Sequence, residues 1–334
     1  MYDWKWYLKE LKQDKNIRVF SCFSCGGGST MGYKRAGFEV LGNVEIDPQM
    51  NEVYIRNHHP KYNYLMDLRD FNKLNNLPEE LYNLDILDGS PPCSTFSTVG
   101  EREKSWGKRK AFREGQKEQT LDDLFFVFLD TVEKLKPKIV IAENVTGLIR
   151  DTAKGYVNEI LERFKSLKYD VQLFKLNAAF MNVPQNRERI FFIANNQKYP
   201  KIKLDFNENP IFFGKVRSEK GKELRGVETK RLLKYIKSND LDLADIKRRL
   251  GEKDSSYSTR IVWDNRVAFT LVANGSFIRA YDKMRYSDID CRNISTFPQD
   301  YNFLNQNPQY ICGMSVPPNM MANLATEIYN QWLK

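Results

Sequence analysis

The chain has 334 residues, enough for about two domains or for one core with a sizeable insertion. Its 52 Lys and Arg residues outnumber its 43 Asp and Glu residues, and this net charge of +9 favours a polyanionic partner over a neutral metabolite. The longest apolar run, Phe125–Leu129, is far shorter than the ~20 residues of a membrane span, and no secretory signal is visible, so we expect an intracellular protein without a membrane segment.

Short apolar runs alternate with amphipathic stretches over the first 200 residues, which predicts an α/β fold whose parallel sheet is flanked by helices. The predicted strands are Arg18–Phe23, Val40–Glu45, Leu84–Asp88, Lys138–Glu143, Val171–Leu176 and Ile190–Ala194. The predicted helices are Met31–Ala36, Pro48–Asn57, Leu121–Leu135 and Tyr156–Leu167, preceded by a short amphipathic helix over Trp4–Lys12.

The pattern changes after about Asn195, where the regular alternation of strands and helices stops. Residues 215–253 carry a net charge of +6, which is two thirds of the total. A charged run of this kind is either a solvated face or a surface for a polyanion. We expect a second, irregular domain here, with regular helix resuming only at about Asn319–Leu333.

A glycine-rich turn, Phe23–Gly28, follows the first predicted strand and precedes a helix. Glycines let a backbone turn sharply and approach a ligand, and Glu45, about 20 residues on, stands where an acid can hold ribose hydroxyls. The spacing differs from the G-x-G-x-x-G of dinucleotide-binding enzymes. The turn therefore indicates either a nucleotide-like cofactor or a glycine contact that packs helix against strand.

Cysteine and histidine spacing argues against metal or disulfide chemistry. Cys22 and Cys25 form a C-x-x-C pair, but the other three cysteines form no second pair for zinc, and five thiols in a chain of this length are expected to be reduced. The two histidines, His58 and His59, are adjacent, which argues against a Ser-His-Asp triad.

The segment from Asp85 to Ser97 ends a buried-looking strand in Pro91, Pro92 and Cys93. Two prolines fix the backbone and present the thiol of Cys93 at the carboxyl edge of the sheet, where open α/β folds bind ligands. A core cysteine would not follow two prolines in a polar loop. Cys93 is therefore a candidate nucleophile, activated by a neighbouring cation or a helix end.

Charged residues follow two more predicted strands. Glu143 ends the strand Lys138–Glu143, where a carboxyl group can donate or share a proton, although a surface glutamate in a strand-to-helix turn would look the same. Arg187 and Arg189 are two residues apart at a strand entry and so share a face. They could bind phosphate, orient a base carbonyl or pair with acids such as Glu188.

Together these motifs resemble the cytosine-C5 DNA methyltransferase family of bacterial and phage type. The resemblance covers most of residues 17–195 and 257–332, and runs in family order through Phe23–Gly28, Glu45, Asp67-Leu68, Pro91-Pro92-Cys93, Glu143-Asn144-Val145, Gln185-x-Arg187-x-Arg189, Arg266–Leu271, Phe297-Pro298 and Gly313–Pro318. It implies a Rossmann-like, S-adenosylmethionine-dependent methyltransferase core with a smaller, irregular target-recognition domain. Departures include Cys25 in place of the family's glycine and Met314 in place of its asparagine.

The resemblance implies a catalytic role for four residues. Cys93 would add to C6 of cytosine, Glu143 would protonate or hydrogen-bond N3, Arg189 would bind O2, and Arg187 would support the Cys93 loop. For the cofactor S-adenosyl-L-methionine, and its product S-adenosyl-L-homocysteine, it implies contacts with the residues Phe23, Ser24, Gly26, Gly28, Glu45, Ile46, Asp67, Leu68, Pro91 and Ser315. No metal is expected.

The implied partner is double-stranded DNA, with the target base flipped out of the helix. The basic loop Gly100–Thr120, of net charge +3, is expected to close over DNA as a lid. We expect a monomeric, cytoplasmic, nucleoid-associated enzyme, and whether a cognate restriction endonuclease acts separately is left open. The alternatives are a transfer-RNA methyltransferase of the same fold and a catalytically idle DNA-binding relative.

The predicted organisation has three parts. Residues 1–196 would form the catalytic and cofactor-binding domain, including an amino-terminal helix over 3–12. Residues 197–285 would form the target-recognition domain, and residues 286–334 would return to the catalytic domain.

Overall fold

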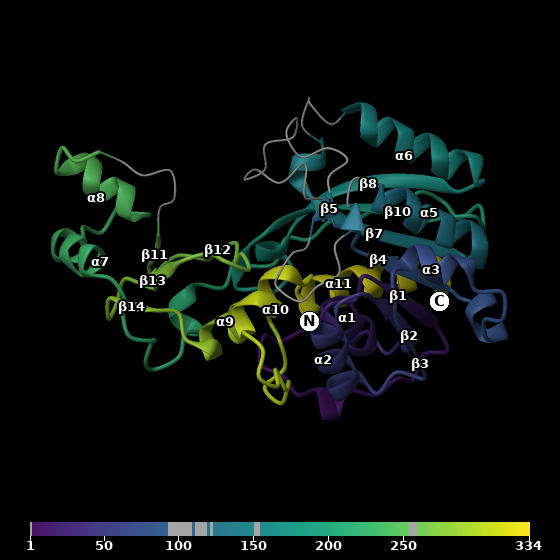
Figure 1. Ribbon diagram of the computed structural model, residues 1–334, viewed down its shortest axis with the longest axis horizontal. Coiled ribbons are helices and arrows are strands. Elements are labelled where there is room, and N and C mark those ends of the chain that lie inside the picture. Colours follow the sequence, from purple (N-terminus) through teal and green to yellow (C-terminus); the bar gives the residue numbers. More distant parts are fainter. Residues whose placement is uncertain (1, 93–108, 111–118, 121–122, 150–153, 254–258) are drawn as a thin grey trace.

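The protein is described from a computed structural model that covers residues 2–92, 109–110, 119–120, 123–149, 154–253 and 259–334. Its largest feature is a seven-stranded sheet in the order β3-β2-β1-β4-β7-β10-β8 (Figure 1). The strands are β1 (Arg18–Cys22), β2 (Glu39–Glu45), β3 (Tyr62–Leu65), β4 (Ile86–Gly89), β7 (Ile139–Val145), β8 (Asp170–Asn177) and β10 (Glu188–Asn195).

All six predicted strands are present, with ends shifted by at most two residues. The sequence pattern missed β3, whose residues are only partly buried and show no apolar run. The sheet is parallel as predicted except at β10, which runs antiparallel to both β7 and β8. The link between β8 and β10 is too short for the crossover that parallel neighbours require, so the chain must reverse there.

Helices cover both faces of the sheet. They are α1 (Gly28–Arg35), α2 (Pro48–His58), α3 (Leu68–Lys73), α5 (Leu124–Leu135), α6 (Lys154–Ser166) and α11 (Pro318–Ile328). Two further helices, α9 (Asp288–Ile294) and α10 (Pro308–Met314), belong to a separate apolar cluster. Successive strand residues face opposite sides, so Val140 packs with α3, α5 and α6, while Ile141 packs with α1 and α11. Burial on both faces explains why the central strands read as continuous apolar runs.

The amino-terminal segment differs from its prediction. Only Leu8–Glu10 forms a helical turn, of the 3-10 type, in place of the helix expected over 3–12. The surrounding residues are instead held by the carboxyl-terminal segment: Trp6 Nε1 donates to the Thr296 carbonyl at 2.8 Å, and the Asp300 carboxylate accepts the Leu8 N–H at 2.6 Å. Tertiary hydrogen bonds therefore override the local amphipathic pattern.

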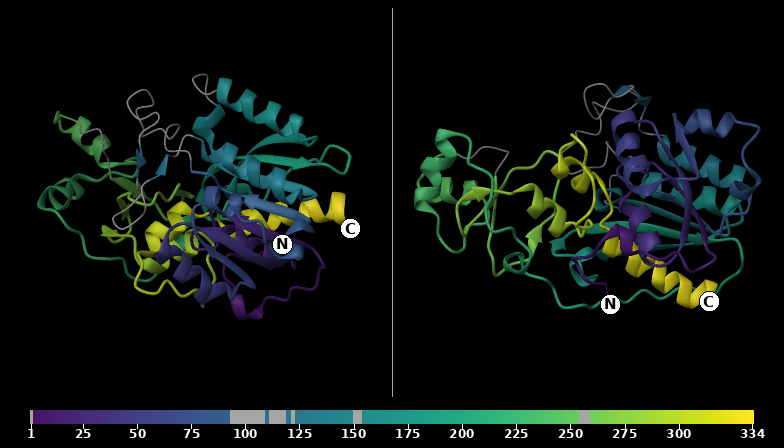
Figure 2. Two further views of the ribbon diagram at one scale, coloured as in Figure 1. Left: turned by 45° about the vertical axis from the view of Figure 1, so that its right-hand side comes forward. Right: turned by 90° about the horizontal axis from the view of Figure 1, so that it is seen from below.

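A smaller lobe follows the sheet and lies apart from it, as Figure 2 shows from two further sides. It contains α7 (Val227–Leu232), α8 (Leu243–Arg249), β11 (Arg260–Val262), β13 (Phe277–Arg279) and β14 (Met284–Arg285). It has an apolar cluster of its own, which includes Leu233, Ile246, Ile261 and Ile278. The short strand β12 (Ala268–Phe269) then pairs in parallel with β9 (Gln185–Asn186), which ties this lobe to the strand entry of β10.

The chain finally returns to the large sheet. Regular helix resumes earlier than predicted, already at α7 and α8 of the smaller lobe and again at α9 and α10, and α11 then packs against α1. A Cβ atom on Gly32 of α1 would lie 2.4 Å from the Cβ of Met321, so only glycine allows this helix approach. Within the described residues, no helix is long and apolar enough to cross a membrane.

Candidate active site

Most of the predicted functional residues lie at the ends of β1, β2, β4 and β7 or just after them, and these four strands are consecutive in the sheet. Their carboxyl ends meet at one edge because the strands are parallel. The turn Phe23–Gly28, Glu45, Pro91 and Glu143 therefore gather at that edge, as the sequence predicts for an open α/β sheet. Cys93 itself lies outside the described residues, as does most of the predicted lid Gly100–Thr120.

Glu143 and Arg189 form an ion pair at this edge. The Arg189 Nε atom lies 2.8 Å from Oε1 of Glu143, and the two side chains are only 13% and 10% exposed. Strand pairing brings them together, because Arg189 of β10 is in register with Val145 of β7. Burial lowers the pKa of Arg189, and the Glu143 carboxylate opposes that change. The pair thus places one acid and one guanidinium at the sheet edge.

Asn144 connects this pair to the proline loop. Its Nδ2 atom donates to the Pro91 carbonyl at 3.2 Å, and its side chain is buried. Pro91 is two residues before Cys93, so the chain that leads to Cys93 is held to the residue next to Glu143.

Arg187 contacts three backbone carbonyls among the described residues, whereas the Cys93 loop that it is expected to support lies outside them. Its guanidinium is buried and donates to the carbonyls of Leu271, Gly313 and Ser315, each at 3.0 Å. Its Nε atom has no partner among the described residues. Burial and the neighbouring Arg189 lower its pKa. The described contacts of Arg187 therefore hold the returning carboxyl-terminal segment against the β10 entry.

The turn after β1 surrounds the carboxylate of Glu45. The Cys25 N–H donates to Oε2 at 2.7 Å, and the Asp47 N–H donates to Oε1 at 2.9 Å. The pKa of Glu45 is raised to about 6, because the effect of burial outweighs the opposing effect of these backbone donors. Phe23 and Cys25 have positive φ angles of 56° and 45°, so Cys25 adopts the left-handed conformation that suits glycine better.

The glycines of this turn also let neighbouring segments of the chain pack closely against it. A Cβ on Gly26 would lie 2.6 Å from Ile311, one on Gly27 would lie 2.1 Å from His58, and one on Gly28 would lie 2.3 Å from the Val316 carbonyl. On the side that a Cβ atom would occupy, these glycines therefore contact α2 and the carboxyl-terminal segment. Ser315 also lies against the turn, because its Cβ atom would be 2.6 Å from a Cβ atom placed on Gly28.

The remaining predicted cofactor residues differ in how far their side chains are buried. Ser24 is buried and its hydroxyl accepts from Asn43 at 2.9 Å, and Leu68 is buried in the core beneath the sheet. Asp67 caps α3 by accepting the Arg69 N–H at 2.9 Å, and Ile46 is half-buried. Ser24 and Leu68 therefore turn their side chains toward the protein interior.

Asp88 is a buried acid that the sequence pattern did not mark as functional. It is 1% exposed at the end of β4 and accepts hydrogen bonds from Ser21 Oγ at 2.9 Å and Tyr33 Oη at 3.0 Å. Burial raises its pKa to about 7, and the charge of Glu143 adds to that increase. The signal in the sequence is an aspartate within an otherwise apolar strand.

Stability should therefore depend on pH through Asp88. The unfolded chain loses this proton near pH 4 and the folded chain near pH 7, so folding binds a proton in between and stability falls as pH rises through that window. Replacing Asp88 with Asn, which keeps an oxygen acceptor, should abolish this pH-dependent decrease in the free energy of unfolding, which amounts to roughly 2–4 kcal/mol. Urea unfolding of both proteins at pH 5 and pH 8 measures the difference, and parallel pH curves would contradict the assignment.

Solved structures with this architecture are methyltransferases. A prophage-encoded E. coli protein described as a DNA modification methyltransferase is 20% identical, with a TM-score of 0.67 over 96% of this chain and 100% of that chain. The Dnmt2 methyltransferase of S. pombe is 15% identical, with a TM-score of 0.63 over 96% of this chain and 100% of that chain. At these identities the likeness shows the fold, which is the Rossmann-like α/β fold of methyltransferases.

The sequence profile described as C-5 cytosine-specific DNA methylase matches residues 17–330, and the chain belongs to that family. Among similar proteins, the type II methyltransferase M.FnuDI of Fusobacterium nucleatum is 27% identical over 86% of this chain and 86% of its own length. M.Sau96I of Staphylococcus aureus is 34% identical over 58% of this chain, which spans 43% of that relative. The chain is therefore an enzyme that methylates C5 of cytosine in DNA, and its family depends on S-adenosylmethionine.

Proposed function

We propose that this enzyme methylates a cytosine flipped out of a specific sequence in double-stranded DNA, through a covalent bond between Cys93 and C6 of the base. The proposal rests on the ion pair of Glu143 and Arg189, together with the hydrogen bond that the neighbouring Asn144 donates to the Pro91 carbonyl. A thiol that enters the same sheet edge after Pro92 would attack a base held by this pair.

Cytosine N3 and O2 match the two members of the pair. Glu143 can place a proton at N3, which offsets the charge that develops when Cys93 adds to C6. Arg189 uses Nε for Glu143 and Nη1 for the Glu188 carbonyl at 2.7 Å, so the guanidinium keeps donors for the base oxygen O2. Once C5 has taken the methyl group of S-adenosylmethionine, loss of the C5 proton to a base allows the Cys93–C6 bond to break, which restores the thiolate.

The residues around Glu45 fit an S-adenosyl group. The Glu45 oxygens accept backbone N–H groups from Cys25, Ile46 and Asp47, and acceptor capacity remains for ribose hydroxyls. Phe23 and Ser315 lie on the same turn or against it. S-adenosylmethionine, when bound, supplies an electrophilic methyl group, and S-adenosylhomocysteine is the product that remains.

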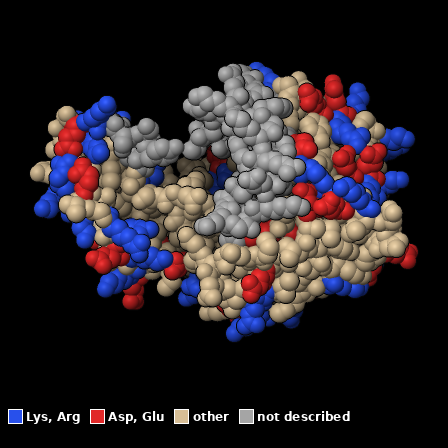
Figure 3. All heavy atoms as spheres, in the orientation of Figure 1, with Lys and Arg blue, Asp and Glu red and all other residues tan. Residues whose placement is uncertain are grey.

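The smaller lobe is the proposed target-recognition domain, within residues 197–285, between a catalytic domain of residues 1–196 and a returning segment of residues 286–334. Figure 3 shows Lys and Arg side chains over this lobe, with acidic residues among them. Several of the arginines are paired: Arg231 with Glu228 and Glu252, and Arg249 with Asp240. The lysines therefore supply much of the positive charge that remains for DNA phosphates.

The test is incubation of the purified enzyme with S-adenosylmethionine and methylation-free genomic DNA, followed by base-resolution methyl sequencing. A recurring sequence context around the methylated cytosines is expected. Methylation of transfer RNA without methylation of DNA would favour the RNA alternative, and DNA binding without methylation would favour an idle relative. We further propose a monomer in the cytoplasm, and screening the neighbouring genes for nuclease activity would show whether a restriction endonuclease accompanies it.

A further inference from the structure

The carbonyl of Gly26, in the turn after β1, accepts hydrogen bonds from two side chains that are distant in sequence. Tyr301 Oη lies 2.5 Å from this oxygen, and Nε2 of His58 lies 3.2 Å from it. His58 is the last residue of α2, and Tyr301 lies in the segment between α9 and α10. Three separate parts of the chain therefore meet at one peptide group.

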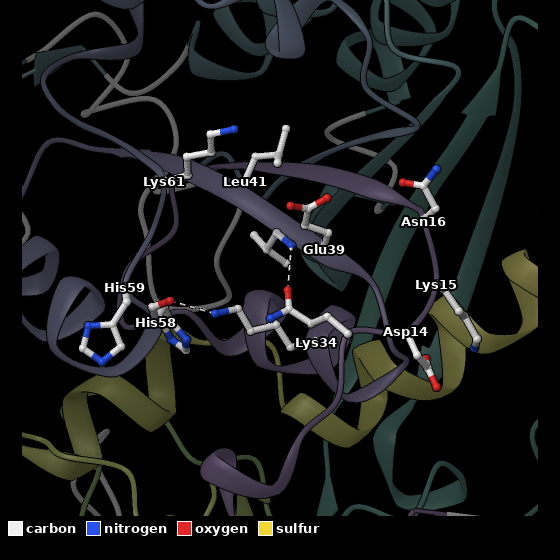
Figure 4. A pocket seen from close by; sticks show the side chains of 11 residues that line it. Asp14, Lys15, Asn16, Lys34, Glu39, Leu41, His58, His59 and Lys61 are labelled. Atoms are coloured by element: carbon white, nitrogen blue, oxygen red, sulfur yellow. Dashed lines mark hydrogen bonds between the residues drawn. The ribbon is translucent and has the colours of Figure 1, made fainter.

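The protonation state of His58 follows from this contact. A carbonyl oxygen only accepts, so Nε2 carries the proton, and Nδ1, which is buried and has no partner among the described residues, does not. Burial and the charge of Lys34 lower the pKa of His58, which agrees with a neutral ring. Figure 4 shows Lys34 and His58 at a pocket of about 530 Å³, with the Lys34 Nζ donating to the His58 carbonyl at 2.8 Å.

The two donors have little freedom to move. The ring centroids of His58 and Tyr54 lie 4.6 Å apart, and those of Tyr301 and Phe297 lie 4.9 Å apart. A Cβ on Gly26 would lie 2.6 Å from Tyr301 Oη, and a Cβ on Gly27 would lie 2.1 Å from His58 Nε2. The glycines at these positions thus let the two side chains reach the backbone of the turn.

The same turn also contacts Glu45. Cys25, one residue before Gly26, donates its N–H to the Glu45 carboxylate at 2.7 Å and has a positive φ angle. A non-glycine residue in that conformation costs about 1 kcal/mol or more, so the turn needs contacts that hold it. The Gly26 carbonyl contacts are suited to that task, because they act one residue away on a separate peptide group.

We propose that His58 and Tyr301 are positioning residues for the cofactor, which hold the turn so that Glu45 faces the ribose of S-adenosylmethionine. The inference rests on the proposed function, since it takes the Glu45 region as the cofactor site. Neither side chain touches the reacting atoms. Their removal should therefore weaken cofactor binding and leave the chemical step nearly unchanged.

The variants His58→Phe and Tyr301→Phe remove the donors and keep the rings. Each should weaken S-adenosylhomocysteine binding, measured by calorimetry, and raise KM for S-adenosylmethionine by about three- to tenfold, with kcat within twofold of the parent. His58→Phe also removes the buried Nδ1 atom, which has no partner in the part of the chain that the structure describes, so its Tm should stay equal or rise. A merely structural role for His58 would lower Tm and leave KM unchanged.

Two matched controls are available. Tyr286→Phe removes another buried tyrosine hydroxyl, one without a partner among the described residues. His59→Asn changes an exposed histidine whose φ angle is positive, a conformation that asparagine tolerates. Both should bind S-adenosylhomocysteine as the parent does. Parental affinity in His58→Phe and Tyr301→Phe would overturn the positioning role alone. Failure of the parent enzyme to bind S-adenosylhomocysteine would overturn the proposed cofactor site and the positioning role with it.

Discussion

Replacing Glu143 with Gln is expected to lower kcat for cytosine methylation by about 10²–10⁴-fold, the usual contribution of a positioned proton donor. Gln has nearly the same shape and can still accept the Arg189 N–H that Glu143 accepts at 2.8 Å, so the site should keep its geometry. It has no proton to place on cytosine N3. Incorporation of labelled methyl groups into DNA under saturating S-adenosylmethionine measures the change.

The control for this variant is Glu133→Gln on α5. Glu133 pairs with Arg163 at 2.6 Å on the surface, and both side chains are partly or largely exposed. Its loss should change kcat by less than twofold, because exposed pairs contribute little. A Glu143→Gln enzyme that retains more than a tenth of the parental kcat would show that Glu143 acts by holding Arg189 and not by proton transfer.

A covalent adduct with 5-fluorocytosine is the second large effect. A duplex that carries this base at the methylated position should form a denaturation-resistant adduct with the parent enzyme and S-adenosylmethionine, because fluorine at C5 blocks the proton loss that releases the enzyme. Cys93→Ala should form none. Gel electrophoresis in denaturant and mass mapping of the modified peptide measure the outcome.

The other thiols make this test sharp. Cys22, Cys291 and Cys312 are buried, and burial raises the pKa of each, that of Cys291 to about 12, so they stay protonated. Of the described cysteines, Cys25 alone is partly exposed. An adduct that persists in Cys93→Ala, or one that maps to the peptide of Cys25, would show that the nucleophile is another residue.

The sequence by itself determined most of the sheet and the position of its functional edge. Strands buried on both faces read as apolar runs, and residues that follow parallel strands must meet at one edge, so Glu45, Pro91 and Glu143 could be placed there in advance. The pairing of Glu143 with Arg189 did not follow from the pattern, since it depends on the register of β10 with β7.

Only the tertiary structure decided what the flanking residues touch. Arg187 reaches Gly313 and Ser315, and Tyr301 reaches Gly26, across more than a hundred residues of chain. The Trp4–Lys12 pattern gave way to hydrogen bonds with Thr296 and Asp300. Local patterns record which faces are buried, whereas the partner of a buried polar group depends on which distant segment packs against it, and periodicity carries no information about that.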